Sequence, residues 1–88
     1  TIANLGSGKI HDVAGGSSAS GTNVWQYSSN PSAAQKWQFI MSSKGLKIIS
    51  SLGTALDVAG GGTANRTNVW AYNQNQTNSQ IWHPISVS

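Results

Sequence analysis

The chain contains an internal repeat, and this repeat restricts the folds open to it more than any other feature. Shifting the 88-residue sequence by 45 positions aligns residues 12–40 with residues 57–85 without a gap, and fifteen of these 29 positions are identical. A repeat of this length is one supersecondary unit, which buries its apolar face against neighbouring units of the same kind. We therefore treat residues 1–88 as a single domain made of two repeats, residues 1–43 and residues 44–88.

Each repeat has the pattern of short β-strands separated by turns. Apolar and polar residues alternate over a few positions, and no segment keeps the 3.6-residue apolar period of a helix. Glycine, serine and asparagine mark the loops and turns between these segments, including a turn between the repeats at residues 41–45. The pattern predicts an all-β fold. The expected strands are residues 2–5, 10–14, 23–27 and 35–40 in the first repeat and residues 46–50, 55–59, 68–72 and 80–85 in the second.

Charged residues are rare, and their distribution argues against several classes of function. They make up 8% of the chain, against roughly 25% in a typical soluble domain. The five Lys and Arg residues form no basic stripe, so we expect no nucleic-acid partner. With no cysteine, no metal cluster in the sequence and no membrane-length apolar run, we expect no metal, no cofactor and no membrane insertion. The 34 Ser, Thr, Asn and Gln residues suit a secreted protein that meets hydroxyl-rich ligands.

Only two residues carry a carboxylate side chain, and they occupy the same place in the repeat. Asp12 and Asp57 each begin the block Asp-Val-Ala-Gly-Gly, which is followed at a fixed distance by Asn-Val-Trp-x-Tyr-x-x-Asn and then by Gln-x-Trp. This series resembles the QxW repeats of ricin-B-type lectins and related carbohydrate-binding modules, and the resemblance covers both copies. It implies a β-trefoil, a fold that normally contains three such repeats around a threefold axis.

The resemblance also implies that something must complete the fold, because this chain has two repeats where the trefoil has three. A missing repeat leaves apolar core and strand edges uncovered. A third repeat could have been removed, the two repeats could pack in another way, or repeats from several chains could complete one another. We expect the last of these, a homo-oligomer that is either a dimer or a trimer.

The resemblance further implies a shallow sugar pocket in each repeat. There a carboxylate accepts charge-assisted hydrogen bonds from sugar hydroxyls, an aromatic ring stacks on the apolar face of the pyranose, and an amide both donates and accepts. The expected partners are glycans, with galactose-type sugars, xylan and cell-wall polysaccharides first. By resemblance, the sugar-binding residues are Asp12, Trp25, Tyr27, Asn30 and Gln35 in the first repeat and Asp57, Trp70, Tyr72, Asn75 and Gln80 in the second.

Several of these residues have a structural alternative. The Asp residues could bond loop amides, the Gln residues could hold loop backbone, and the aromatic side chains could belong to an interface between chains. Trp37 and Trp82 of the Gln-x-Trp motif are expected in the core. Many members of the family carry Asn directly before this Gln, whereas this chain has Ala34 and Ser79 there, so one common sugar contact is lost.

Catalysis is not expected. Glycoside hydrolysis uses two carboxyl groups that converge on one bond, but Asp12 and Asp57 lie in separate repeats. Strand alternation also turns His11 away from the face that carries Asp12. The sequence therefore predicts a lectin with two equivalent sugar sites and no catalysis. The alternatives are a secreted bacteriocin-like or toxin-like antimicrobial protein that recognises cell-surface glycans, and a carbohydrate-binding module severed from a glycoside hydrolase.

Overall fold

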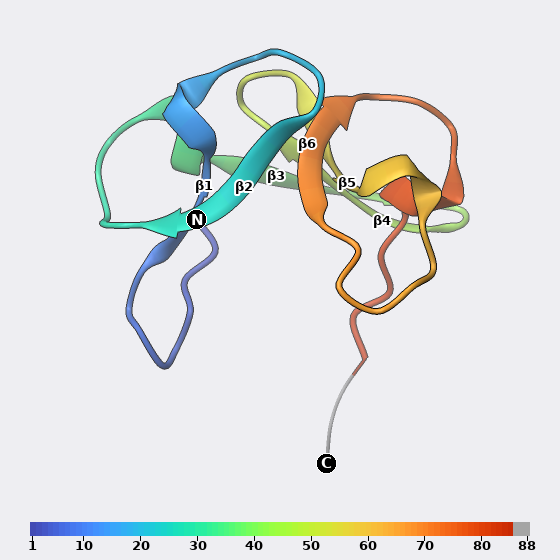
Figure 1. The fold of residues 1–88 in the computed structure, drawn as a ribbon, viewed down its shortest axis with the longest axis horizontal. Coiled ribbons are helices and arrows are strands. Elements are labelled where there is room, and N and C mark those ends of the chain that lie inside the picture. The colour runs from blue at the N-terminus through green and yellow to red at the C-terminus, as the bar shows by residue number, and fades with distance from the viewer. Residues whose placement is uncertain (86–88) are drawn as a thin grey trace.

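The computed structural model describes residues 1–85 and confirms the all-β prediction. Six antiparallel strands form one curled sheet in the spatial order β1-β2-β6-β5-β4-β3. Figure 1 shows β1 and β2 of the first repeat on the left and β6 of the second repeat on the right, with β2 and β6 as neighbours. The strands are β1 (Ile10–Val13), β2 (Thr22–Tyr27), β3 (Trp37–Ser42), β4 (Gly45–Ser50), β5 (Thr54–Val58) and β6 (Val69–Asn73). The short 3₁₀ turns are η1 (Ala14–Gly16), η2 (Ala33–Gln35), η3 (Ala59–Gly61) and η4 (Asn78–Gln80).

The register of the strand pairs places each Asp directly opposite a Trp. Asp12 of β1 lies opposite Trp25 of β2, and Asp57 of β5 lies opposite Trp70 of β6. Directly opposed residues in an antiparallel pair place their side chains on the same face of the sheet. His11 is exposed while Asp12 is buried, as expected for neighbours whose side chains alternate along a strand.

The paired glycines of Asp-Val-Ala-Gly-Gly turn the chain out of the strand. Gly15 and Gly16 both have a φ of 64°, and Gly60 and Gly61 have φ values of 62° and 65°. A residue with a Cβ adopts this left-handed conformation at a cost of roughly 1–2 kcal/mol, whereas glycine adopts it freely. A Cβ at any of these positions would meet nothing within 4 Å. Conformation rather than space therefore explains the duplicated glycine pair, and the turn leaves bare backbone beside each Asp.

The core is small and is shared between the repeats. Val13 and Ala34 of the first repeat meet Ala71 of the second, and all three are at most 4% exposed. Trp37 packs against this cluster and is partly buried, in line with its expected core position. Its indole N–H donates to the backbone oxygen of His11 at 3.2 Å, so the ring also ties β3 to β1.

The first and last predicted strands do not form within residues 1–85. Residues 2–5 contribute only a bridge from Ala3 to Ile10, and residues 80–85 contribute only a bridge from Trp82 to Leu46. In the middle of the chain, β3 closes the first repeat and pairs along its whole length with β4, which opens the second. A strand at either place therefore needs an adjacent repeat to pair with, which the outer segments of this chain lack.

The side chains on one face of β3 are partly buried at its start and exposed toward its end. Trp37, Phe39 and Met41 lie on the same face because successive side chains of a strand alternate. Trp37 packs against the core, but Phe39 is 58% exposed and Met41 is 75% exposed. We call Phe39 and Met41 the open apolar edge. It is apolar surface that continues from Trp37 along this face of β3 and that residues 1–85 leave exposed.

A loop of the first repeat packs against the second. The backbone N–H of Gly21 donates to the oxygen of Ala71 at 2.8 Å, and the N–H of Asn73 donates to Ser20 Oγ at 2.8 Å. A Cβ placed on Gly21 would lie 3.5 Å from the ring of Trp70. These contacts explain why Trp70 is half-buried while its counterpart in the first repeat is exposed.

The corresponding loop of the second repeat keeps the same conformation. Arg66 stands where the first repeat has Gly21, and it retains a left-handed φ of 71°. The hydroxyl of Thr67 donates to Ala64 O at 2.7 Å, just as the hydroxyl of Thr22 donates to Ala19 O at 2.6 Å. The loop therefore has the shape that contacts a neighbouring repeat in the first half of the molecule.

Candidate functional site

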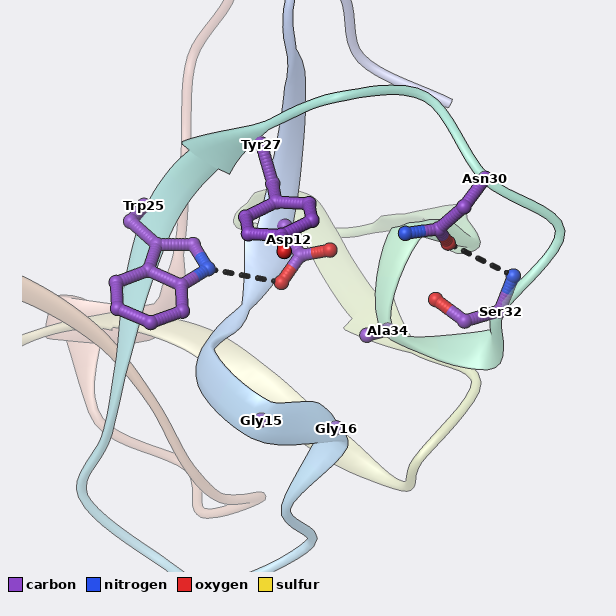
Figure 2. A pocket seen from close by; sticks show the side chains of 8 residues that line it. All are labelled: Asp12, Gly15, Gly16, Trp25, Tyr27, Asn30, Ser32 and Ala34. Atoms are coloured by element: carbon purple, nitrogen blue, oxygen red, sulfur yellow. Dashed lines mark hydrogen bonds between the residues drawn. The ribbon is translucent and has the colours of Figure 1, made fainter.

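The structure contains two similar open pockets, one in each repeat. The first has a volume of 280 Å³ and the second a volume of 290 Å³. Figure 2 shows the first pocket between the aromatic side chains of β2 on one side and the loop that follows β2 on the other. Its lining residues are Asp12, Gly15, Gly16, Trp25, Tyr27, Asn30, Ser32 and Ala34. The second pocket is lined by Asp57, Gly60, Trp70, Tyr72, Asn75, Thr77 and Ser79.

The carboxylate of each Asp is held by two side-chain donors. Asp12 is 5% exposed, and its Oδ1 accepts a hydrogen bond from the indole N–H of Trp25 at 2.9 Å. Its Oδ2 accepts from Nε2 of Gln35 at 2.9 Å. A carboxylate can accept about four hydrogen bonds, so each oxygen of Asp12 keeps capacity for a ligand. Neither of these donors is a loop amide, which was the structural alternative for this residue.

The second pocket repeats this arrangement around Asp57, which is 4% exposed. The indole N–H of Trp70 donates to Oδ1 at 3.3 Å, and Nε2 of Gln80 donates to Oδ2 at 2.6 Å. The carboxylate is therefore oriented in the same way in both repeats. Because the bonds come from the strand opposite and from a turn 23 residues away, the strand pairing and the 3₁₀ turn must both form before the site exists.

Gln35 lies beneath its pocket rather than in the lining. It is 1% exposed, and its Oε1 accepts a hydrogen bond from the backbone N–H of Asn30 at 2.9 Å. Its Nε2 donates both to Asp12 and to the backbone oxygen of Ser28 at 2.9 Å. Both amide hydrogens are thereby used within the protein. The side chain fixes the carboxylate and the loop over residues 28–35 at the same time.

Gln80 has the corresponding set of partners. It is 2% exposed, accepts from the N–H of Asn75 at 3.0 Å and donates to Asn73 O at 2.9 Å. The resemblance assigns the two Gln residues to sugar binding, whereas the structure places each one beneath its pocket, hydrogen-bonded to the Asp carboxylate. A direct contact between these amides and a ligand stays a prediction.

The aromatic side chains stand as stacked pairs. The rings of Trp25 and Tyr27 have centroids 6.2 Å apart and an interplanar angle of 22°, and those of Trp70 and Tyr72 are 5.3 Å apart at 18°. Trp25 is 45% exposed and Tyr27 is 52% exposed, so this pair offers apolar ring surface to solvent at the pocket. The indole that bonds the carboxylate is thus also part of the apolar wall.

The opposite wall comes from the loop after the aromatic strand. Asn30 Oδ1 accepts a hydrogen bond from the N–H of Ser32 at 3.0 Å, which fixes the side chain in a tight local turn. Figure 2 shows Asn30 reaching toward the pocket from this loop, with Ser32 and Ala34 below it. Ser32 is a lining residue that the resemblance does not assign to the site. In the sequence, the one sign of its role is that a hydroxyl residue stands two positions after the Asn in both repeats, Ser32 in the first and Thr77 in the second.

Each site therefore combines a fixed carboxylate, an aromatic wall and a short polar loop around a shallow space. Such a site can recognise a small ligand that carries adjacent hydroxyls and an apolar face. Within residues 1–85, no group of three or more His, Cys, Asp or Glu side chains is placed to hold a metal ion. No helix in the described part of the chain is long and apolar enough to cross a membrane.

Comparisons with known proteins identify the family and the fold. The model of the ricin-type β-trefoil lectin domain family matches residues 1–87. A comparison with curated protein sequences finds no match. Among solved structures, a designed 3-fold symmetric protein, ThreeFoil, is 31% identical, and the alignment has a TM-score of 0.86 over 92% of this chain and 59% of that one. These matches confirm the ricin-B-type resemblance and the partial β-trefoil.

Two natural proteins are also similar in structure. An exo-β-1,3-galactanase from Clostridium thermocellum is 30% identical, with a TM-score of 0.91 over 98% of this chain and 19% of the enzyme. The Polyporus squamosus lectin, solved with Neu5Acα2-6Galβ1-4GlcNAc, is 27% identical, with a TM-score of 0.79 over 92% of this chain and 28% of that lectin. The chain thus spans from about a fifth to three fifths of the length of these similar structures.

Proposed function

Because the chain belongs to the ricin-type β-trefoil lectin family, we propose that it is a carbohydrate-binding protein with one sugar pocket in each repeat. The observation that carries this proposal is the duplicated arrangement around Asp12 and Asp57. In both places a carboxylate is fixed by a Trp and a Gln and retains acceptor capacity beside an aromatic wall. Neighbouring hydroxyls of a pyranose would donate to the carboxylate while the apolar face of the sugar packs on the ring.

Galactose-containing glycans are the first ligands to test. One structural neighbour is a galactanase, and another is a lectin solved with a galactose-containing epitope. The same galactanase supports a second context for this function. The chain aligns over 98% of its length with 19% of that enzyme, so it has the size of an accessory module in a larger protein. In either context we propose that the two repeats bind glycans and that neither carries out catalysis.

The test should close the pockets without removing buried hydrogen bonds. Replacing Asp12 or Asp57 would leave the N–H groups of Trp and Gln unpaired, so a loss of binding could reflect a loss of the fold. Ser32 and Thr77 are exposed lining residues, and a tyrosine at these positions would fill the pockets from the rim. The double variant Ser32→Tyr/Thr77→Tyr is expected to lose glycan-array binding while it keeps the circular-dichroism spectrum and melting temperature of the native protein.

A matched control uses the same substitution at another pair of repeat positions. Ser18 and Thr63 are exposed, are related by the same 45-residue shift and line neither pocket. Ser18→Tyr/Thr63→Tyr is expected to bind as the native protein does. Equal glycan signals from the native protein and from folded Ser32→Tyr/Thr77→Tyr would refute the proposal.

We further propose that the chain acts as a homo-oligomer in which a repeat from another copy covers the open apolar edge. The support comes from the contacts between the two repeats of one chain. The loop of residues 65–68 has the conformation of the loop that contacts the second repeat, and Phe39 and Met41 present apolar surface beside the core. An assembly would also join several weak pockets in one particle, which can raise avidity by roughly 10² to 10⁴ on a multivalent glycan surface.

A further inference from the structure

The two pockets differ in the polar groups of the loop wall, although the carboxylate and the aromatic rings are duplicated. At the three lining positions of this wall the first pocket has Asn30, Ser32 and Ala34, and the second has Asn75, Thr77 and Ser79. The asparagine is shared, but the second pocket carries two hydroxyl groups where the first carries one. The position before the Gln of Gln-x-Trp is therefore a methyl group in one pocket and a hydroxyl group in the other.

The hydroxyl groups of the second pocket form a directed chain. Oδ1 of Asn75 accepts from the N–H of Thr77 at 3.0 Å and from the hydroxyl of Thr77 at 2.6 Å. A threonine hydroxyl has one hydrogen, so Thr77 has none left for its 2.8 Å contact with Ser79 Oγ. Ser79 must then be the donor in that contact. Each hydroxyl hydrogen on this wall has a fixed direction.

The chain determines what the second pocket presents to a ligand. Both lone pairs of Asn75 Oδ1 are used, so this amide offers a ligand only the N–H groups of Nδ2. The hydroxyl of Ser79 donates its only hydrogen to Thr77, so toward a ligand the oxygen of Ser79 can only accept a hydrogen bond. A sugar hydroxyl on this wall must therefore accept from Asn75 and donate to Ser79. The epimer places its hydroxyl oxygen at a different point, so this one hydroxyl cannot reach both Asn75 and Ser79.

The first pocket imposes no such order. Oδ1 of Asn30 accepts only from the N–H of Ser32 among the described residues, so this amide can both accept and donate. The hydroxyl of Ser32 has no hydrogen-bond partner in the described part of the chain and can rotate to suit a ligand. Ala34 adds only a methyl group. The wall can adapt to hydroxyls in either orientation.

We propose that the second pocket is selective for the configuration of one sugar hydroxyl, that the first pocket is permissive, and that Thr77 and Ser79 determine the difference. This inference rests on the proposed glycan-binding function and replaces the expectation of two equivalent sites. Losing one correctly paired hydrogen bond on the second wall should weaken binding of the wrong epimer by about tenfold, because leaving a partner of such a bond unpaired costs about 1.4 kcal/mol. The first pocket should distinguish the same epimers by less than about threefold.

The test uses the two indole N–H groups as separate reporters. Trp25 and Trp70 each donate to the carboxylate of their own pocket, so their NMR signals should shift when that pocket is filled. The native protein is titrated with the methyl β-glycosides of glucose, galactose and mannose, because galactose and mannose each differ from glucose in the configuration of one hydroxyl. The Trp70 signal is expected to give dissociation constants that span tenfold or more, and the Trp25 signal is expected to give a much narrower range.

Two variants then move the selectivity without closing a pocket. Ser79→Ala removes the fixed acceptor and should reduce the epimer ratio reported by Trp70 to that reported by Trp25. Ser32→Thr/Ala34→Ser builds the hydroxyl chain into the first pocket and should raise the ratio reported by Trp25. Equal epimer ratios at the two indoles of the native protein would overturn this inference while leaving glycan binding intact. No shift at either indole with any glycoside, together with a blank glycan array, would overturn the proposed function itself.

Discussion

The residues that hold each pocket together are largely buried, while the residues that define its rim are exposed. Gln35 joins Asp12, Asn30 and Ser28 through one amide, and Gln80 does the same in the second repeat. Such networks stabilise a fold strongly only when every member is paired, because an unpaired buried polar group costs more than a neutral hydrogen bond contributes. Stability and the proposed binding therefore depend on the same carboxylate, which the protein holds with two hydrogen bonds and which keeps capacity to accept more.

Gln35→Leu is expected to lower the free energy of unfolding by at least about 3 kcal/mol, because it leaves the carboxylate of Asp12, an N–H and a carbonyl without their partner. Urea denaturation followed by tryptophan fluorescence measures the change. Gln38→Leu makes the same chemical change on the exposed side chain of β3 and should alter stability by less than about 0.5 kcal/mol. Equal losses of unfolding free energy in the two variants would show that the buried hydrogen-bond network does not stabilise the protein more than an exposed side chain does.

Thr54→Val should have the opposite sign. The side-chain oxygen of Thr54 is buried and has no hydrogen-bond partner among residues 1–85. Replacing this hydroxyl by a methyl group of similar shape removes the cost of burying it unpaired, so we expect a gain in unfolding free energy of about 1 kcal/mol. Thr22→Val is the control, because the hydroxyl of Thr22 donates to Ala19 O and its loss should destabilise the protein. A thermal melt that ranks the two variants in the reverse order would contradict this account.

At the level of elements, the short strands and 3₁₀ turns depend on one another. η2 and η4 contain the Gln residues, and η1 and η3 follow the Asp strands directly. The turns are too short to be stable alone and take their shape from glycine conformation and from the buried amides. A change in the backbone conformation of one turn should therefore alter the geometry of the pocket beside it.

Gly60→Ala tests the conformational requirement in η3. We expect it to lower the free energy of unfolding by roughly 1–2 kcal/mol, because alanine is strained at a φ of 62° although the site has room for a Cβ. Gly60→Asn should cost clearly less, since asparagine tolerates the left-handed region better. Chemical denaturation of both variants distinguishes this explanation from a steric one, in which the larger asparagine would be the more harmful substitution.

The sequence predicted those parts of the fold and site that follow from local periodicity and from the repeat. Strand alternation placed His11 away from Asp12, and the 45-residue shift paired every pocket residue with its counterpart. The sequence could not predict that Gln35 reaches under Asp12, since this contact depends on how a turn packs against a strand 23 residues earlier. It also predicted strands at residues 2–5 and 80–85, where the composition is right but no adjacent repeat supplies a partner.

At the scale of the whole molecule, the open apolar edge is apolar surface that the two repeats of one chain do not cover. Light scattering is expected to give a mass above the 9.2 kDa of one chain, with the assembled fraction rising with concentration. Phe39→Ser/Met41→Ser should shift the protein toward monomer, because it removes apolar surface on the core-facing side of β3. Ile40→Ser, on the other face of the same strand, should leave the mass unchanged. A mass of one chain at all concentrations would refute assembly.

The placement of both acidic side chains in the pocket floors also matters for the proposed binding of glycans. Asp12 and Asp57 are 5% and 4% exposed, whereas four of the five basic residues are exposed and the fifth is half-buried. The charged side chains that meet solvent are therefore almost all of one sign. Long-range attraction to sulfated or carboxylated glycan layers should speed association at low ionic strength and fade as the Debye length shortens. Capture from a distance and recognition within the pocket would then respond differently to salt.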